Sequence, residues 1–407
     1  MKILHTADWH LGKKLNEFSR LDEQKEVLHE ICNLADQHQV DVVLIAGDLF
    51  DTFNPPADAV ELFYQTLHRL SNRGQRAVVA IAGNHDSADR IEAPDPLARA
   101  CGIVFSGYPA TEVPAFSLES GLKSVHSAPG FIELSLPQYE YPLRLLLTPY
   151  ANEARLRQFL GVNDPEAAFR QVLEESWQST AQKYCDEQGV NILLSHLFMV
   201  NGTEEQPVEE PEDEKHILHV GGAQAVYTEN IPSQIQYTAL GHLHRFHFAN
   251  KKNASPVVYS GSLLEYSFSE AHQQKFVMLL DAVPGEEVQV TPLKITSGKK
   301  LYRKRFESPG EALEWLEQNQ DCFVELTLVS DDYLSAQLKK ELFNVHSGIV
   351  TLIPEVKRDR LEREGVEHID PSRDVELLFK QYFQHKKGQE VNEELLELFR
   401  QVTHRES

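Results

Sequence analysis

Five short apolar segments of this chain share one property: each is followed within a few residues by a side chain that can bind a metal ion. The segments are short, rich in branched residues and bounded by polar residues or glycine, which is typical of buried strands. They are 3–6 before Asp8 and His10, 42–46 before Asp48, 77–82 before Asn84 and His85, 191–194 before His196, and 237–240 before His242 and His244. Ligand sites in open α/β sheets form beyond the carboxyl ends of the strands, so neighbouring strands would bring these side chains to one rim.

Helix-patterned stretches alternate with these strands. Residues 21–39 and 57–72 are long enough for helices, and the second has apolar residues at helical spacing. Further strands are expected at 143–148, 257–259 and 276–280, and further helices at 152–161 and 165–188. Alternation of strand and helix predicts an α/β architecture with at least one largely parallel sheet.

The pattern changes after about residue 283 to that of a small α+β unit. Strands are expected near 287–292, 323–328 and 349–353, and helices near 309–318 and 334–343. A charged linker at 357–367 then leads to two short amphipathic helices. The expected division is therefore 1–282, 283–357, a linker at 358–370, and a helical hairpin at 371–407. Residues 204–215 hold seven acids and two prolines, which predicts a solvated loop or an acidic flap.

Composition limits the possible partners. The 407 residues suggest two to three domains at about 150 residues each. The net charge of −23 excludes binding to DNA or an anionic membrane by bulk attraction, so contact with DNA would need local basic patches, cations or a partner. Four cysteines without a CxxC pair exclude a zinc knuckle or a disulfide framework, and we expect a cytoplasmic protein without membrane segments.

The candidate ligands indicate which metals fit. Two carboxylates, one amide oxygen and four imidazoles suit Mn²⁺, Fe or Zn²⁺ better than Mg²⁺ alone. Seven ligands are too many for one tetrahedral zinc, but they serve two ions if one carboxylate bridges. Two ions about 3.5–4 Å apart can activate a water and stabilise both oxygens of a displacement at phosphorus. Gly47, Gly83 and Gly241 stand beside the ligands, where the backbone must approach closely.

The motifs D-x-H, G-D-x-x-D, G-N-H-D, a lone strand-end His and G-H-x-H occur here in the order of the calcineurin-like metallophosphoesterases. The whole chain, with HTADWHLG at its start, resembles the bacterial SbcD-type exonuclease subunits of the DNA double-strand-break repair nucleases. This resemblance implies a four-layer α/β/β/α sandwich with a small α+β capping domain and a C-terminal helical hairpin.

The resemblance also implies residue roles and partners. Asp8, His10 and His244 would hold one Mn²⁺, Asn84, His196 and His242 the other, and Asp48 would bridge them. His85 would protonate the leaving 3′ oxygen or stabilise the pentavalent phosphate, and Asp51 would hydrogen-bond His85 and raise its pKa. The family further implies a homodimer, a heterotetramer of two plus two with an SbcC-type coiled-coil ATPase, and single-strand endonuclease and ATP-regulated 3′→5′ exonuclease activity.

Two further sets of residues are candidates for binding. The basic run that opens the second unit, together with one serine of the stretch YSGSLLEYSFSE, would contact DNA phosphates or else form a solvated strand edge: Lys299, Lys300, Arg303, Lys304, Arg305 and Ser262. Apolar stripes on the two C-terminal helices would dock on the ATPase or fold back on the core: Leu378, Phe379, Tyr382, Phe383, Leu395 and Phe399.

The sequence is also compatible with two other functions. A phosphodiesterase or phosphatase acting on small molecules would use the same centre, but it gives no role to the second unit or to the C-terminal helices. A non-catalytic scaffold is disfavoured, because all seven candidate ligands and His85 are present.

Overall fold

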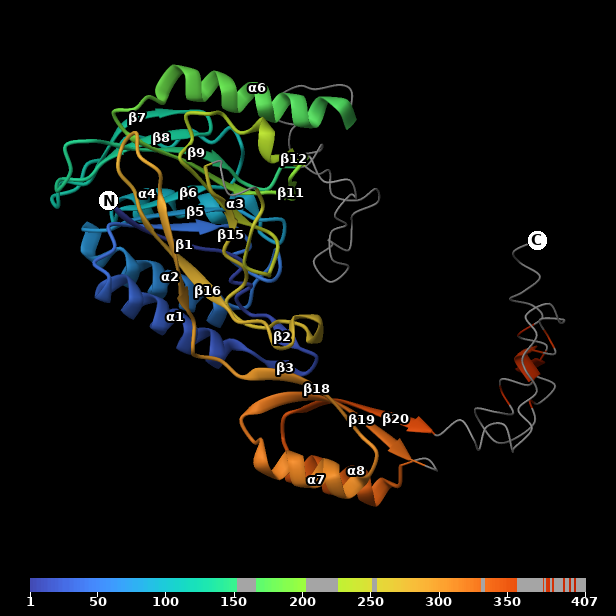
Figure 1. Ribbon diagram of the computed structural model, residues 1–407. Helices are drawn as coiled ribbons and strands as arrows, with labels where there is room; N and C mark the ends of the chain where they lie inside the picture. Colours follow the sequence, from blue (N-terminus) through green and yellow to red (C-terminus); the bar gives the residue numbers. More distant parts are fainter. Residues whose placement is uncertain are drawn as a thin grey trace.

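The structure is a computed structural model, shown in Figure 1. It describes residues 1–151, 166–202, 226–250, 255–330 and 334–356, together with 376, 378–380, 383, 391, 395, 396 and 399. The helix expected at 152–161, the acidic segment 204–215, the linker at 358–370 and Tyr382 lie outside these residues. Among the described helices, none combines the length and apolarity needed to cross a bilayer.

The first sheet has six strands in the order β17-β16-β1-β4-β5-β6. Its strands are β1 (Lys2–Thr6), β4 (Val42–Ala46), β5 (Ala77–Ile81), β6 (Ile103–Ser106), β16 (Phe276–Asp281) and β17 (Gln289–Lys294). The run β1-β4-β5-β6 is parallel, as the alternation of strands with α1 (Leu21–Gln37) and α2 (Ala57–Leu70) predicted. The antiparallel strand β17 was expected in the second unit, but it pairs with β16 here.

The second sheet has seven strands in the order β14-β15-β13-β10-β9-β8-β7. They are β7 (Lys123–Ala128), β8 (Phe131–Ser135), β9 (Leu143–Thr148), β10 (Val190–His196), β13 (Tyr237–Gly241), β14 (His247–Phe248) and β15 (Val257–Tyr259). The four central strands, β9, β10, β13 and β15, are parallel. The predicted strands at 143–148 and 257–259 are confirmed to the residue.

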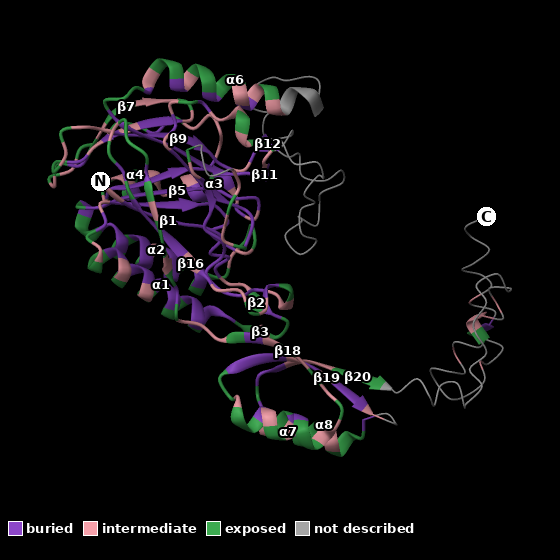
Figure 2. Cartoon of the chain, viewed as in Figure 1, coloured by how far each residue is buried: buried purple, intermediate pink, exposed green. Residues whose placement is uncertain are grey.

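The two sheets pack face to face, and helices cover their outer faces (Figure 1). Alternate residues of β4 show this arrangement: Val43 packs with α1 and α2, whereas Val42 and Leu44 pack with the second sheet. On the far side, Trp177 of α6 (Glu166–Tyr184) packs against the second sheet. The central strands of both sheets are buried (Figure 2), whereas the edge strands β7 and β17 are mostly half-buried or exposed. The layers are therefore α/β/β/α, as expected.

A smaller unit has its own sheet and core. It runs β18 (Lys300–Phe306), α7 (Pro309–Gln318), β19 (Cys322–Ser330), α8 (Ala336–Val345), β20 (Ile349–Val356), with three parallel strands in the order β18-β19-β20. Ser308 and Ser335 cap the two helices by accepting from Glu311 N and Leu338 N. The sheet of this unit thus begins at Lys300, later than the expected boundary near residue 283.

The remaining described elements are short and lie mainly in loops around the two sheets. They are β2 (Lys14–Leu15), β3 (Phe18–Ser19), η1 (Asn72–Gly74), α3 (Ala88–Glu92), α4 (Asp95–Arg99), β11 (Met199–Val200), β12 (Val226–Tyr227), η2 (Thr228–Asn230) and η3 (Phe268–Glu270). Near the C-terminus the Phe379 ring stacks on that of Phe399, with centroids 4.1 Å apart.

Candidate metal centre

The seven predicted metal ligands are all buried and lie together where the carboxyl ends of both sheets meet. Loops after β1, β4 and β5 of the first sheet and the ends of β10 and β13 of the second sheet carry Asp8, His10, Asp48, Asn84, His196, His242 and His244. The parallel central strands explain this, because their carboxyl ends point the same way.

Asp48 lies at the meeting point of two groups of ligand atoms. In the first group, His10 Nε2 is 3.0 Å from His244 Nε2. In the second, Asn84 Oδ1 is 2.8 Å from His196 Nε2 and 3.1 Å from His242 Nδ1. Asp48 Oδ2 is 3.5 Å from both His10 Nε2 and His196 Nε2. One carboxylate oxygen is thus equally close to both groups, as a bridging ligand must be.

The buried atoms of this centre fit metal ions. Asp8 Oδ1 accepts a hydrogen bond from His242 N, but its buried Oδ2 has no hydrogen-bond partner. Ligand atoms of Asp8, His10 and Asp48 all lie within 4.8 Å of one another. Burial raises the pKa of Asp8 to about 7. Buried carboxylates need compensating positive charge. Two divalent cations would supply it, and oxygen and imidazole donors suit Mn²⁺, Fe or Zn²⁺.

Backbone conformation is strained at four of the ligands. Asp8, His10, Asp48 and His242 have positive φ angles of 51°, 44°, 48° and 111°. Such angles are uncommon outside glycine and concentrate at functional sites. A Cβ on Gly83 would lie 2.1 Å from Asp48 Oδ1, and a Cβ on Gly241 would lie 1.8 Å from the Ala46 carbonyl oxygen. The close approach predicted for the neighbouring glycines is therefore confirmed.

Asp86 links, by hydrogen bonds, two of the loops that carry candidate metal ligands. Its buried carboxylate accepts hydrogen bonds from the main-chain N–H groups of Gly83, Leu49 and Phe50, at 2.8–3.0 Å. The loop after β5 is thereby tied to the loop after β4. Sequence reasoning assigned this residue no role, although it stands in the G-N-H-D motif.

His85 stands at the edge of the centre and is held by main-chain atoms. Its N–H donates to Asp48 Oδ1 at 2.9 Å, and its Nδ1 donates to the Asp51 carbonyl at 2.8 Å. The Asp51 carboxylate, expected to make this bond, instead accepts from Lys13 Nζ at 2.7 Å. It still lies within 4.8 Å of a ring nitrogen of His85. The expected contact exists, but the oxygen that makes it belongs to the backbone, because the loop turns the Asp51 side chain towards Lys13.

Ser262 does not fit the expected role in phosphate binding. Its side chain is fully buried, and its hydroxyl contacts Glu270 and Lys275. Glu270 in turn accepts a hydrogen bond from His244 Nδ1 at 3.1 Å. The stretch 259–270 therefore holds the candidate metal ligand His244 in place through Glu270. The signal for this role in the sequence is the carboxylate of Glu270, eight residues after Ser262.

The basic run lies on and just before β18, and most of its cations have acidic neighbours. Arg303 pairs with Glu325 at 2.8 Å, and Arg305 pairs with Glu355 at 2.9 Å. The remaining members differ: Lys299 is 3.5 Å from Asp321, Lys304 lies over the Trp315 ring, and Lys300 is exposed. Exposed ion pairs such as these are weak, so phosphate could displace them.

The C-terminal residues expected to bind a partner are only partly described. Leu378, Phe379, Phe383 and Phe399 are half-buried, and Leu395 is 37% exposed. The rings of Phe379 and Phe383 have centroids 6.1 Å apart. The two stripes therefore contact each other through the stack of Phe379 on Phe399.

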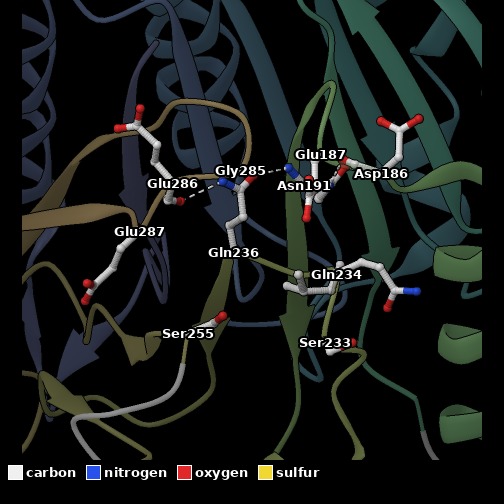
Figure 3. Close-up of a pocket in the computed structure, with 11 residues that line it drawn as sticks. Asp186, Glu187, Asn191, Ser233, Gln234, Gln236, Ser255, Gly285, Glu286 and Glu287 are labelled. Carbon is white, nitrogen blue, oxygen red and sulfur yellow. Dashed lines mark hydrogen bonds between the residues drawn. The ribbon is translucent and has the colours of Figure 1, made fainter.

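A cavity of about 690 Å³ lies at the end of the second sheet opposite the candidate metal ligands. Figure 3 shows the residues that line it. Asn191, near the start of β10, and Gln236, just before β13, contribute to its wall. Its acidic lining residues are Asp186, Glu187, Glu286 and Glu287. None of the candidate metal ligands lines it, so it is separate from the metal centre.

Comparison with known families matches this geometry. The profile of the calcineurin-like phosphoesterases matches residues 1–246. Because this match spans more than half of the chain, the protein is a calcineurin-like phosphoesterase, a metal-dependent hydrolase of phosphoester bonds. The fold described above is the one expected from the resemblance in the sequence.

Similarity to individual relatives shows which group of calcineurin-like phosphoesterases the chain belongs to. The chain is 35% identical to the D subunit of the nuclease SbcCD of Bacillus subtilis, over 98% of this chain and 97% of the relative. Relatives of the same name from Staphylococcus epidermidis and Rhodobacter capsulatus are 30% and 32% identical, each over 72% of this chain and about 70% of the relative. The chain belongs to the SbcD family of nuclease subunits. A dimetal phosphatase structure from Danio rerio aligns with a TM-score of 0.40 at 14% identity, covering 73% of this chain and 99% of that one.

Proposed function

We propose that this chain is the nuclease subunit of a two-metal DNA-cleaving complex, with Mn²⁺ as the preferred ion and Mg²⁺, Fe or Zn²⁺ as alternatives. The observation that carries the proposal is the position of Asp48 Oδ2, 3.5 Å from a ligand nitrogen of each group. Asp8, His10 and His244 would hold one ion and Asn84, His196 and His242 the other. When bound, the ions would activate water and stabilise negative charge at phosphorus.

His85 would donate a proton to the leaving group. Because Nδ1 donates to the Asp51 carbonyl, proton transfer to a leaving 3′ oxygen would use Nε2. The N–H of His85 donates to Asp48 Oδ1, so its backbone is fixed relative to the bridging carboxylate. This anchoring supports a role for His85 in catalysis rather than in metal binding.

DNA is the proposed substrate because the relatives are named as subunits of a nuclease. We expect endonuclease activity on single strands and 3′→5′ exonuclease activity on duplex ends, in repair and recombination. The run Lys299–Arg305 of the capping unit would supply phosphate contacts that the net charge of −23 does not supply. The chain lacks a GxxxxGK[ST] motif, so ATP regulation would come from another subunit.

That subunit would be an SbcC-type coiled-coil ATPase, in an assembly of two copies of each chain. The C-terminal stripes on 371–407 would dock on it, and two copies of the present chain would form a homodimer through residues near 57–72 and 87–101. The half-buried aromatic residues Phe379, Phe383 and Phe399 support docking on a partner. Such a complex would work in the cytoplasm, at the nucleoid during repair.

The test is to purify the chain with and without the ATPase and measure Mn²⁺-dependent cutting of a hairpin duplex, with and without ATP. We expect cutting that needs Mn²⁺ and, for duplex ends, both the ATPase and ATP. Bis-p-nitrophenyl phosphate and cyclic nucleotides are assayed in parallel. Turnover of these small esters without cutting of DNA would instead support a small-molecule phosphodiesterase.

A further inference from the structure

Within the described residues, the contacts of His244 extend into a buried ion pair. Its Nδ1 donates to Glu270 Oε1 at 3.1 Å, and Glu270 Oε2 is 2.5 Å from Lys275 Nζ. Both partners are almost fully buried, with 2% and 5% of their surface exposed. Since burying an ion pair carries a large desolvation cost, a contribution to stability alone does not explain why it is placed here.

The Glu270–Lys275 pair belongs to a hydrogen-bond network around His244. Lys275 Nζ also donates to the main-chain carbonyl of His244 at 3.0 Å and to Ser262 Oγ at 2.9 Å. Ser262 Oγ is 3.2 Å from Glu270 Oε2, and Ser262 N donates to the His244 carbonyl at 3.1 Å. The side chain and the backbone of His244 are therefore both fixed by the same three residues.

The contact with Glu270 sets the orientation of the imidazole. A carboxylate that accepts from Nδ1–H fixes the tautomer in which Nε2 carries the lone pair. That Nε2 faces His10 Nε2 at 3.0 Å, inside the first group of ligand atoms. Glu270 Oε2 lies beside Lys275 Nζ, so a cation faces the carboxylate on the side away from His244 Nδ1. The pair adds no net charge, because Lys275 balances Glu270.

The imidazole of His196, in the second group, is supported differently. Its Nδ1 lies 2.8 Å from the main-chain carbonyl of Ala46, a neutral acceptor. A carboxylate makes a ligating imidazole more basic than a carbonyl does, and loss of such a partner typically weakens metal binding 10- to 100-fold. We propose that Glu270, held by Lys275 and Ser262, is a positioning residue that orients His244 and supports one of the two cation sites and not the other.

This inference rests on the proposed two-cation centre, and its test separates the two ideas. Mn²⁺ binding to the full chain is measured by equilibrium dialysis and calorimetry for the wild type, Glu270→Gln and Glu270→Ala. We expect two ions per wild-type chain. One site should weaken about 10-fold in Glu270→Gln and about 100-fold in Glu270→Ala. The other site should keep its affinity.

A double variant separates metal binding from folding. Glu270→Gln leaves Lys275 buried without its carboxylate, which lowers stability, whereas Glu270→Gln with Lys275→Met removes both charges. Thermal unfolding in EDTA should therefore improve in the double variant while the weakened metal site stays weak. Glu133→Gln is the matched control, because Glu133 pairs with Arg144 at 2.7 Å away from the ligands. It should leave both Mn²⁺ affinities unchanged.

Each other outcome has a definite meaning. If the wild type binds fewer than two ions, the proposed centre fails before Glu270 is considered. If it binds two and the Glu270 variants keep both affinities within twofold, Glu270 is not a positioning residue. Equal weakening of both sites, or recovery of metal affinity together with stability in the double variant, also overturns the inference.

Discussion

At the scale of single residues, His85 and the candidate metal ligands differ in the contacts that hold them in place. His85 is half-buried and anchored through its own N–H and Nδ1. The candidate ligands are buried, and their ring nitrogens and their carboxylate or amide oxygens lie 2.8–3.5 Å from one another. A residue that is close to the centre but outside both groups can be removed without removing a ligand atom.

The first prediction is that His85→Ala abolishes turnover while metal binding is retained. The loss of a general acid or base typically lowers the rate 10²- to 10⁴-fold. Mn²⁺ stoichiometry should remain that of the wild type, because no ligand atom is deleted. Metal analysis after dialysis, beside a nuclease assay on hairpin DNA, checks both parts. Loss of manganese from the variant would mean that His85 is itself a ligand.

The second prediction concerns the neighbour of His85. Asp51→Asn should keep the bond to His85 Nδ1, because the acceptor is the Asp51 carbonyl. We therefore expect a smaller effect on the turnover rate than in His85→Ala, about 10-fold or less, from the loss of a nearby charge that pairs with Lys13 and lies 3.6 Å from His10 Nδ1. Steady-state rates of the two variants, measured side by side, decide this. An equal loss in both variants would restore the catalytic role first expected for the Asp51 carboxylate.

At the scale of elements, the centre depends on tight loops after parallel strands. The loops after β4 and β5 touch where Gly83 meets Asp48. We predict that Gly83→Ala destroys the centre, since a Cβ would lie 2.1 Å from Asp48 Oδ1. Overpacking of this kind costs about 1–3 kcal/mol, and Mn²⁺ binding should be lost with it. Unfolding in denaturant and metal analysis measure the two effects.

Gly310 provides the control for this substitution. It lies in the first turn of α7, and a Cβ added there would meet nothing within 4 Å. Gly310→Ala should leave metal binding unchanged and raise stability slightly, by about 0.5–1 kcal/mol at most. Equal tolerance of both alanines would contradict the close packing of the ligand loops.

A further element-scale prediction links α1 to the chain that leads into the small unit. Glu30 of α1 accepts hydrogen bonds from Thr296 N, Thr296 Oγ1 and Ser297 N at 2.7–3.1 Å. Burial raises the pKa of Glu30, but these bonds outweigh it and lower the pKa below its usual value. A lowered pKa gives stability that is present above the unfolded-state pKa, about 4.3, and is lost as the pH falls further.

Glu30→Gln should accordingly cost about 1 kcal/mol at pH 6, since the carboxylate is partly exposed. The difference in Tm between wild type and variant should shrink as the pH falls from 6 to 3, because the wild-type carboxylate becomes protonated. A difference that stays constant over this range would show that the charge of Glu30 contributes nothing.

At the scale of the whole molecule, the features that depend on strand direction were well predicted from the sequence. The central strands and the position of the candidate ligands were predicted because short apolar strands that run parallel bring the residues after them to one edge of the sheet. The placement of β17 was wrong, because its alternating edge pattern does not say which sheet it joins. The roles of Ser262 and of the Asp51 carboxylate were also mispredicted, since hydrogen-bond partners depend on loop conformation that spacing does not determine.

The division into units gives the last prediction. The candidate ligands all precede residue 245, and the cores of the two large sheets contain no described residue beyond Ile295. Deletion of residues 357–407 should therefore leave Mn²⁺ binding and cutting of single-stranded DNA close to wild type, while it removes binding to the ATPase and the ATP-regulated activity. Copurification with the ATPase and the two nuclease assays measure these effects. Phe379→Ala in the full chain is the finer variant, because it removes the stack with Phe399 and nothing near the metal centre. If the truncated chain still bound the ATPase, the contact would lie on the catalytic or capping unit, and the exposed strand β18 would become the next surface to test.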